Sequence, residues 1–139
     1  MRSRTRTGVT TLALVGSLLI LPPVARADVV LDWNQIMLAT IGGQSPFVQA
    51  RVGAITQLAV FEAVNAIDRR YQPYLGTIVS GAGASRSAAA VAAPHTVLKS
   101  YFPGQGASLD AARASSLAAI QDGSAKSAGI AVVSGRPPN

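Results

Sequence analysis

Few side chains in this sequence could carry out acid–base, nucleophilic or metal chemistry. Among its 139 residues there are one histidine, His95, six acidic residues and no cysteine. A zinc site needs three or four converging ligands, and His95 has no second histidine to join it. Asp110 is its nearest acid in sequence, and a helix-breaking segment at 103–106 separates the two. We therefore expect His95 to be a structural or surface residue.

Glu62, Asn65 and Asp68 recur at steps of three residues and form one polar ridge on a predicted helix. Glu62 continues the apolar stripe of that helix, where an unpaired carboxylate is costly. We expect it to form an ion pair or hydrogen bond between helices, with Arg51 or an arginine of a neighbouring helix. A functional carboxylate is the alternative. The three oxygens of the ridge could contact a cation, but hard cations usually take six or more ligands.

The sequence holds no motif for nucleophilic or phosphate chemistry. It contains no Gly-x-Ser-x-Gly nucleophile elbow, and one histidine would have to serve every catalytic triad. The glycines at 81–83 lack the Gly-x-Gly-x-x-Gly pattern of a dinucleotide site, and those at 104–106 lack the Lys-Ser/Thr pair of a phosphate loop. We predict no catalytic, cofactor-binding or metal-binding residue in this chain.

The N-terminal segment 1–27 has the pattern of a cleaved export signal. Three arginines are followed by an apolar run at 9–21, by two prolines, and by a small-x-small site that ends at Ala27. An uncleaved membrane anchor is the alternative, but a spanning helix needs about 20 apolar residues. We expect cleavage between Ala27 and Asp28, export to the periplasm or the medium, and contact with a membrane only during export.

Removal of this segment changes the charge of the chain. The full sequence has 12 Lys plus Arg and six Asp plus Glu, a net charge of +6. Four of the basic residues precede the predicted cleavage site, so eight bases and six acids remain, a net charge of +2. Nucleic-acid binding needs clustered Lys and Arg on one face, and after Asp28 only Arg69 and Arg70 are adjacent. We expect no nucleic-acid partner.

Helical periodicity describes the rest of the chain better than strand alternation does. We expect an all-α fold, an incomplete bundle of four or five helices, over residues 28–133, with an irregular tail at 134–139. The expected helices run from about Asp32 to Ile41, from Pro46 to about Arg69, from Arg86 to about Phe102, from Leu109 to Gln121, and from Ser124 through Val132.

Local signals set the ends of these helices. Asp32, Ser85 and Ser108 are suitable N-cap residues. Pro94 interrupts the third helix, where we expect a kink or a restart near Ala93. The many Ala, Gly and Ser residues bury little area each, so such helices should be more stable when packed against further protein.

Three stretches carry a family resemblance: Asp-Val-Val-Leu-Asp-Trp-Asn at 28–34, Phe-Glu-Ala-Val-Asn-Ala-Ile at 61–67, and Tyr-Phe-Pro-Gly-Gln at 101–105. Together they resemble the N-terminal helical region of secreted bacterial proteins similar to vanadium-dependent haloperoxidases, within the type 2 phosphatidic acid phosphatase superfamily. The resemblance covers roughly residues 28–131. It implies an all-α bundle and, in complete members, a buried pocket that holds vanadate or the transferred phosphate.

The resemblance implies that three motifs in the C-terminal half of complete members form the oxyanion pocket. These are a Lys followed by Arg-Pro, a Pro-Ser-Gly-His segment, and a Ser-Arg stretch before a second His. Pro-Ser-Gly-His is missing here, and neither Lys99 nor Lys126 has an Arg-Pro at the right distance. Arg136-Pro137 is a bare dipeptide in the tail. We expect no cofactor for this chain, and vanadate only in a complete family member.

Two functions of different class follow from these observations. The first is the N-terminal scaffold of a haloperoxidase-like or acid phosphatase-like enzyme, truncated and inactive alone, with a missing C-terminal half or another subunit as its partner. The alternative is a small secreted helical binding or interaction protein without catalysis.

Overall fold

The described part of the chain is built from helices alone. The computed structural model describes residues 28–76, 78–80 and 83–134. In these ranges it contains five α-helices and no strand, which confirms the expected all-α class. They are α1 (Val29–Ile41), α2 (Pro46–Asp68), α3 (Arg86–Tyr101), α4 (Gly106–Ala118) and α5 (Ser124–Ser134), with a 3₁₀ turn, η1 (Pro103–Gln105), before α4.

The predicted signal segment 1–27 lies outside the described residues, and so does most of the predicted tail, at 135–139. Cleavage between Ala27 and Asp28 therefore stays a prediction. Asp28 itself is described, directly before α1.

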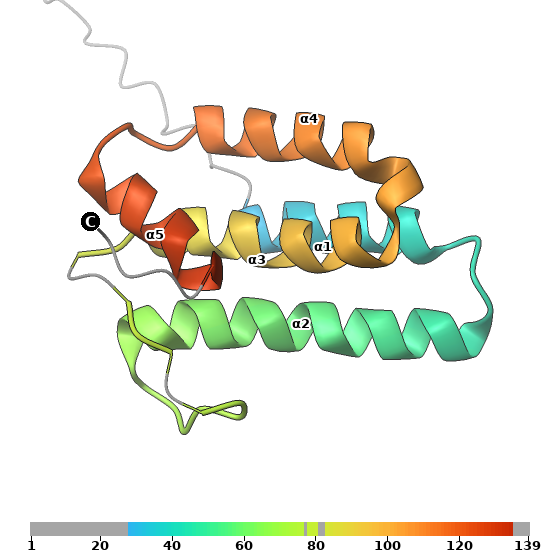
Figure 1. Ribbon diagram of the computed structural model, residues 1–139, viewed down its shortest axis with the longest axis horizontal. Helices are drawn as coiled ribbons and strands as arrows, with labels where there is room; N and C mark the ends of the chain where they lie inside the picture. The colour runs from blue at the N-terminus through green and yellow to red at the C-terminus, as the bar shows by residue number, and fades with distance from the viewer. Residues whose placement is uncertain (1–27, 77, 81–82, 135–139) are drawn as a thin grey trace, which may run out of the picture.

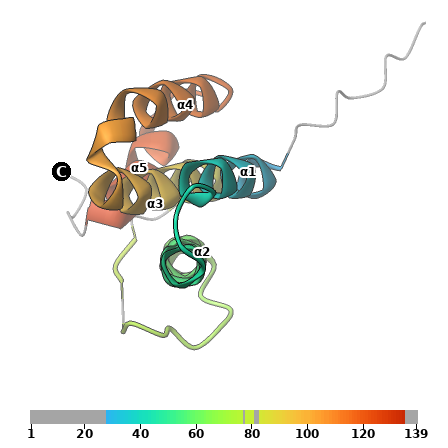
Figure 2. The same cartoon turned by 90° about the vertical axis from the view of Figure 1, so that its right-hand side faces the viewer.

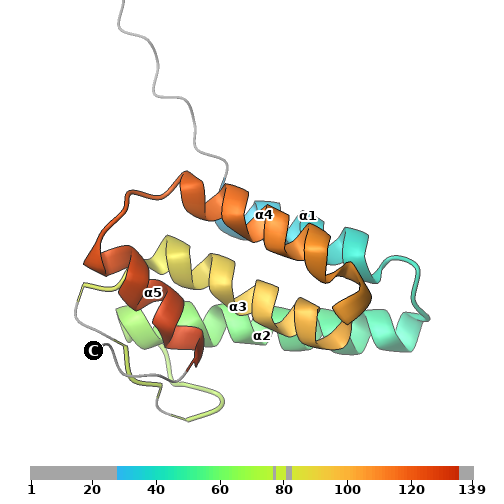
Figure 3. The same ribbon diagram turned by 45° about the horizontal axis from the view of Figure 1, so that its top comes forward.

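α3 is the central helix of the bundle. It packs against each of the other four helices (Figure 1). α2 runs along one side of α3 and α1, and α4 lies on the opposite side of α3 (Figure 2). The short α5 lies across the first part of α3 (Figure 3). The connection from α2 to α3 passes along the outer side of α2 (Figure 2).

Small side chains on α3 let four helices approach it. Residues 88–93 of α3 are five alanines and one valine, all of them buried, and Pro94 is buried with them. Small side chains allow close approach of helix axes but bury little area each. The larger core residues therefore come mostly from the surrounding helices, with Trp33, Met37 and Ile41 on α1 and Leu109 and Leu117 on α4.

Two expected helix starts were wrong. α1 begins at Val29, and Asp28, not Asp32, is its N-cap: an Asp28 carboxylate oxygen accepts the Val30 N–H at 3.0 Å. The earlier start places Val29 against the core, which a start at Asp32 would not do. Ser85 caps α3 as expected and accepts the Ala88 N–H.

The start of α4 also differs from the expectation. The helix begins at Gly106 rather than Leu109, directly after η1, and it ends at Ala118 rather than Gln121. Ser108 lies inside α4 and is not the cap of the helix, which is Gln105. The Ser108 hydroxyl donates to the Gln105 carbonyl oxygen at 2.8 Å. The expected breaker 103–106 is thus a tight 3₁₀ turn that leads directly into the helix.

Pro94 does not restart α3, which is assigned as one helix from Arg86 to Tyr101. An interior proline removes one helical hydrogen bond and costs about 3 kcal/mol in isolation. The side chain of Pro94 is fully buried in the interior of the bundle. Packing against four neighbouring helices offsets the intrinsic cost.

α2 is long and apolar enough, by length and composition, to cross a membrane, and it is the one such helix among the described residues. Core helices of water-soluble proteins pass the same test when they are mostly buried. In this bundle only 22% of the most apolar stretch of α2 is buried. Much of the rest of α2 is half-buried, and Phe47 is its most exposed large apolar side chain.

Two glycines in helix interiors should respond oppositely to alanine. A Cβ on Gly129 would overlap the Ser85 carbonyl oxygen and approach the Ala88 Cβ to 3.0 Å, whereas a Cβ on Gly53 would meet only Ile41 Cδ1, at 3.8 Å. We expect Gly129→Ala to destabilise the fold by about 1–3 kcal/mol through overpacking. Gly53→Ala should stabilise it by about 0.5–1 kcal/mol through helix propensity. Urea unfolding followed by circular dichroism measures both, and shifts of the same sign would contradict this packing.

Candidate functional site

His95, Lys99 and Asp110 form the densest group of charged and titratable side chains in the described part of the chain. His95 Nε2 lies 2.8 Å from Asp110 Oδ1, and Lys99 Nζ donates to both oxygens of the same carboxylate, at 2.8 and 2.7 Å. The sequence placed Asp110 beyond a break, and we did not expect it to reach His95. Because η1 turns the chain tightly, α4 folds back along α3 and brings the two residues together.

The position of His95 is fixed from two sides. Its ring meets the ring of Trp33 edge to face, with centroids 6.2 Å apart and an interplanar angle of 89°. The indole N–H of Trp33 donates to Ser116 Oγ at 3.2 Å. Trp33 is buried, and the side chain of His95 is 12% exposed. An imidazole held between an indole and a lysine-bound carboxylate suits the structural role that we expected for His95.

The electrostatics of this group favour the ionised form of Asp110. The hydrogen bond from Lys99, and then that from His95, lower the pKa of Asp110 from its ordinary value of 3.8. Removal of the proton lets the carboxylate accept both donors at once. Ionised Asp110 therefore links α3 to α4 across the turn.

The acid stability of the protein should depend on Asp110. A carboxyl whose pKa is lowered in the folded state adds stability above its unfolded pKa, and this stability is lost as the pH falls through the folded pKa. We expect Asp110→Asn to melt at a lower temperature than the parent at pH about 6, with a difference that shrinks as the pH falls below 3.8 and through the lower pKa of the folded state. Thermal melts across this range measure it.

Lys99→Gln provides the control for this measurement. In a Lys99→Gln background the effect of Asp110→Asn should shrink, because the two residues share one interaction. A melting difference that stays constant down to pH about 2 would contradict the assigned ion pair.

The three residues of the predicted polar ridge hold different partners. Glu62 is buried, and one of its carboxylate oxygens accepts the backbone N–H groups of Tyr74 and Leu75. Asn65, also buried, accepts the Tyr71 N–H at 2.9 Å and donates to the Tyr71 carbonyl oxygen at 2.8 Å. The two side chains thus bind the connection after α2 to the outer side of that helix.

Of the two expected interactions of Glu62, an ion pair or a hydrogen bond between helices, it makes hydrogen bonds, but to the connection after α2 and not to a neighbouring helix. Glu62 binds backbone N–H groups, and Arg51 is exposed. Asp68 makes the ion pair between helices, with Arg86 of α3 at 3.2 Å. Within the described residues no three His, Cys, Asp or Glu side chains are grouped closely enough to hold a metal ion. Each side chain of the ridge therefore has a partner within the protein.

Loss of the Glu62 carboxylate should loosen the connection at 69–76. Glu62→Leu leaves two N–H groups without their acceptor, which costs about 1–3 kcal/mol, whereas Glu62→Gln keeps an acceptor oxygen and serves as the matched control. We expect faster hydrogen exchange at Tyr74 and Leu75 in Glu62→Leu and near-parent exchange in Glu62→Gln. Equal protection in both variants would contradict the assigned hydrogen bonds.

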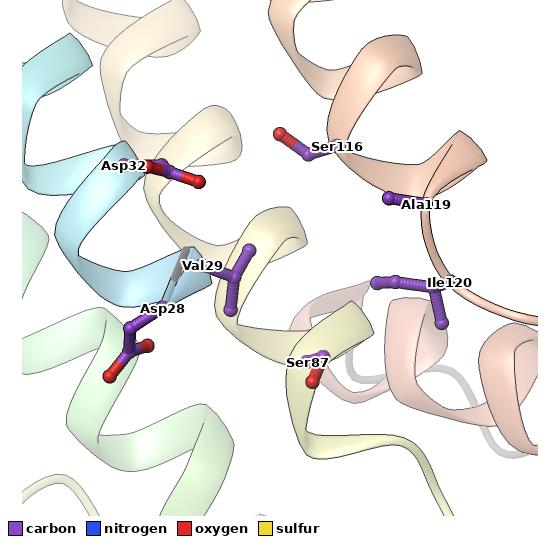
Figure 4. A pocket seen from close by; sticks show the side chains of 7 residues that line it. All are labelled: Asp28, Val29, Asp32, Ser87, Ser116, Ala119 and Ile120. Atoms are coloured by element: carbon purple, nitrogen blue, oxygen red, sulfur yellow. The ribbon is translucent and has the colours of Figure 1, made fainter. Parts of the chain in front are cut away.

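A cleft lies between the start of α1, the start of α3 and the end of α4 (Figure 4). It has a volume of about 500 Å³, and its lining residues are Asp28, Val29, Asp32, Ser87, Ser116, Ala119 and Ile120. Asp32 and Ser116 point into the gap from opposite sides (Figure 4). Carboxylates and hydroxyls bind cations or amines, whereas an oxyanion needs Lys, Arg or N–H donors. This cleft is therefore unsuited to vanadate or phosphate.

The sequence offered no signal for this cleft, because its lining combines residues from three separate helices. Comparison with known proteins gave no further guide: no family model, no curated protein and no solved structure matches this chain. The functional argument therefore depends on the residues themselves and on what they contact.

Proposed function

We propose that this chain is the N-terminal helical scaffold of a secreted haloperoxidase-like or acid phosphatase-like enzyme, without catalytic activity of its own. One observation carries the proposal. The three stretches on which the resemblance depends, 28–34, 61–67 and 101–105, hold the bundle together. The two carboxylates that they bring to the cleft of Figure 4, those of Asp28 and Asp32, are not oxyanion ligands.

The first stretch anchors α1. Asp28 caps the helix, and Trp33 is the largest fully buried side chain of the described chain. Asn34 accepts a hydrogen bond from Gln57 of α2 at 2.7 Å, so this stretch also links the first two helices. A capping residue, a core aromatic and a link between helices are structural roles.

The other two stretches fasten connections. Glu62 and Asn65 hold the chain that leaves α2. In the last stretch, the side-chain amide of Gln105 donates to the Thr40 carbonyl oxygen at 3.1 Å and thereby joins η1 to α1. Residues of these types at these places support a scaffold role for the three stretches.

The charges of the described side chains agree with a scaffold role. Lys99, Lys126 and Arg86 each pair with an aspartate of the bundle. A vanadate or phosphate pocket would require several cationic side chains that converge on one point. In the resembled family those residues belong to motifs that this sequence does not contain.

An activity assay tests the absence of catalysis. The purified chain, supplied with vanadate, peroxide and bromide, should halogenate a phenolic indicator no faster than the same mixture without protein. It should also release no phosphate from a generic phosphomonoester above the buffer rate. Turnover that scales with protein concentration in either assay would refute the proposal.

The encoding locus tests the family assignment separately. We expect the nucleotide sequence beyond codon 139, read in all three frames, to encode the Pro-Ser-Gly-His segment and the motif of the second His. A downstream sequence without these motifs in any frame would contradict the assignment.

A binding or interaction protein without catalysis is the second candidate, and the large exposed side chains on α1 and α2 favour it. A cooperative thermal transition of the isolated chain would support this function. A molten state that binds a hydrophobic dye would instead favour the scaffold, since such a bundle needs further protein to complete its packing.

A further inference from the structure

Before the residues that hold the connection at 69–76, the outer face of α2 carries an apolar stripe that the described bundle leaves largely exposed. We call Phe47, Ala50, Ala54, Leu58 and Phe61 the α2 stripe. These residues recur at steps of three and four, so they follow one side of the helix. Phe47 is 87% exposed and Phe61 36%, Ala50 and Ala54 are exposed, and Leu58 is half-buried.

Tyr71 extends the stripe beyond the end of α2. Its ring lies 6.1 Å from that of Phe61, centroid to centroid, and the residue is 69% exposed. The hydrogen bonds between Asn65 and Tyr71 fix the position of its backbone. One end of the stripe therefore carries an aromatic pair, and the other end carries Phe47 alone.

The positions of the stripe are spaced symmetrically about Ala54. Phe47 and Phe61 lie equally far from it on either side, and so do Ala50 and Leu58, which differ in size. When such a face meets a second copy of itself across a two-fold axis, each position faces its counterpart at the same distance from the axis, as in most homodimer interfaces. We propose that α2 pairs antiparallel with α2 of a second copy of this chain, with the axis at Ala54.

The pairing places complementary sizes opposite each other. Phe47 lies level with Phe61 and Tyr71 of the second copy, which gives an aromatic cluster at each end of the interface. Ala50 lies level with Leu58 of the second copy, so a small side chain faces a larger one. Ala54 faces its own counterpart at the centre, where two small side chains let the helices approach closely.

The charges on this face permit the contact. Arg51 is the one charged residue of α2 before the buried Glu62. In the symmetric pairing Arg51 lies level with Gln57 of the second copy, which is polar and uncharged. Along residues 47–61 no like charges meet, and Arg51 can remain solvated at the rim of the interface.

The area available is sufficient for a reversible dimer. An aromatic side chain buries about 150–250 Å², so the exposed parts of six rings in two copies supply roughly 750 Å². With the aliphatic residues of the stripe the total reaches about 1,000 Å², near the lower limit for a specific interface. We therefore expect monomer and dimer to exchange with concentration.

Sedimentation velocity of the purified chain over a wide concentration range tests the proposal. The parent should shift from monomer to dimer as its concentration rises. Ala54→Glu places two carboxylates against each other at the axis and should weaken the dimer at least about tenfold. Ala114→Glu, an exposed alanine on α4, is the matched control and should associate like the parent. Far-ultraviolet circular dichroism and melting temperature show that both variants fold.

A charge-rescue experiment tests the position of the axis. Ala54→Glu and Ala54→Lys should each be largely monomeric, and their equimolar mixture should regain the dimer. A parent that stays monomeric, an Ala54→Glu dimer of parent strength, or a mixture that stays monomeric would overturn the proposal. So would parent binding to neutral lipid vesicles through α2 without self-association. This inference does not rest on the scaffold function, because the activity assay and the downstream sequence have no bearing on self-association.

Discussion

The close approach of four helices to α3 is the constraint on which the rest of this structure depends. The small side chains at 88–93, five alanines and Val91, let α1, α2, α4 and α5 lie near one central axis, and a larger side chain in place of an alanine would push a neighbour away. The same alanines contribute little buried area. The bundle therefore relies on a few large residues, Trp33 above all, and on hydrogen bonds that fasten its connections.

The sequence predicted the fold class and most helices because apolar periodicity and capping residues are local signals. Where two local signals competed, packing decided: Asp28 was selected over Asp32 as the cap of α1, since the longer helix brings Val29 to the core. The restart that was one of the two outcomes expected at Pro94 does not occur, for a related reason. The cost of the proline is local, whereas the packing that offsets it comes from helices distant in sequence.

The side-chain partners were much harder to predict than the helices. Asp110 reaches His95 only because η1 is tight enough to fold α4 against α3, and nothing in the spacing of the two residues indicates this. The polar ridge was recognised from its three-residue spacing, and the need of Glu62 for a partner was foreseen. Its actual partners are backbone N–H groups, which no sequence pattern marks.

The contact between α5 and the start of α3 has a consequence for how the protein is made. The Ser85 N–H donates to the Ala125 carbonyl oxygen at 2.8 Å, and Gly129 lies against the same residue. The chain is synthesised from the N-terminus, so the start of α3 gains these contacts only after α5 has left the ribosome. The packing around the start of α3 is therefore completed only after residue 129 has been synthesised.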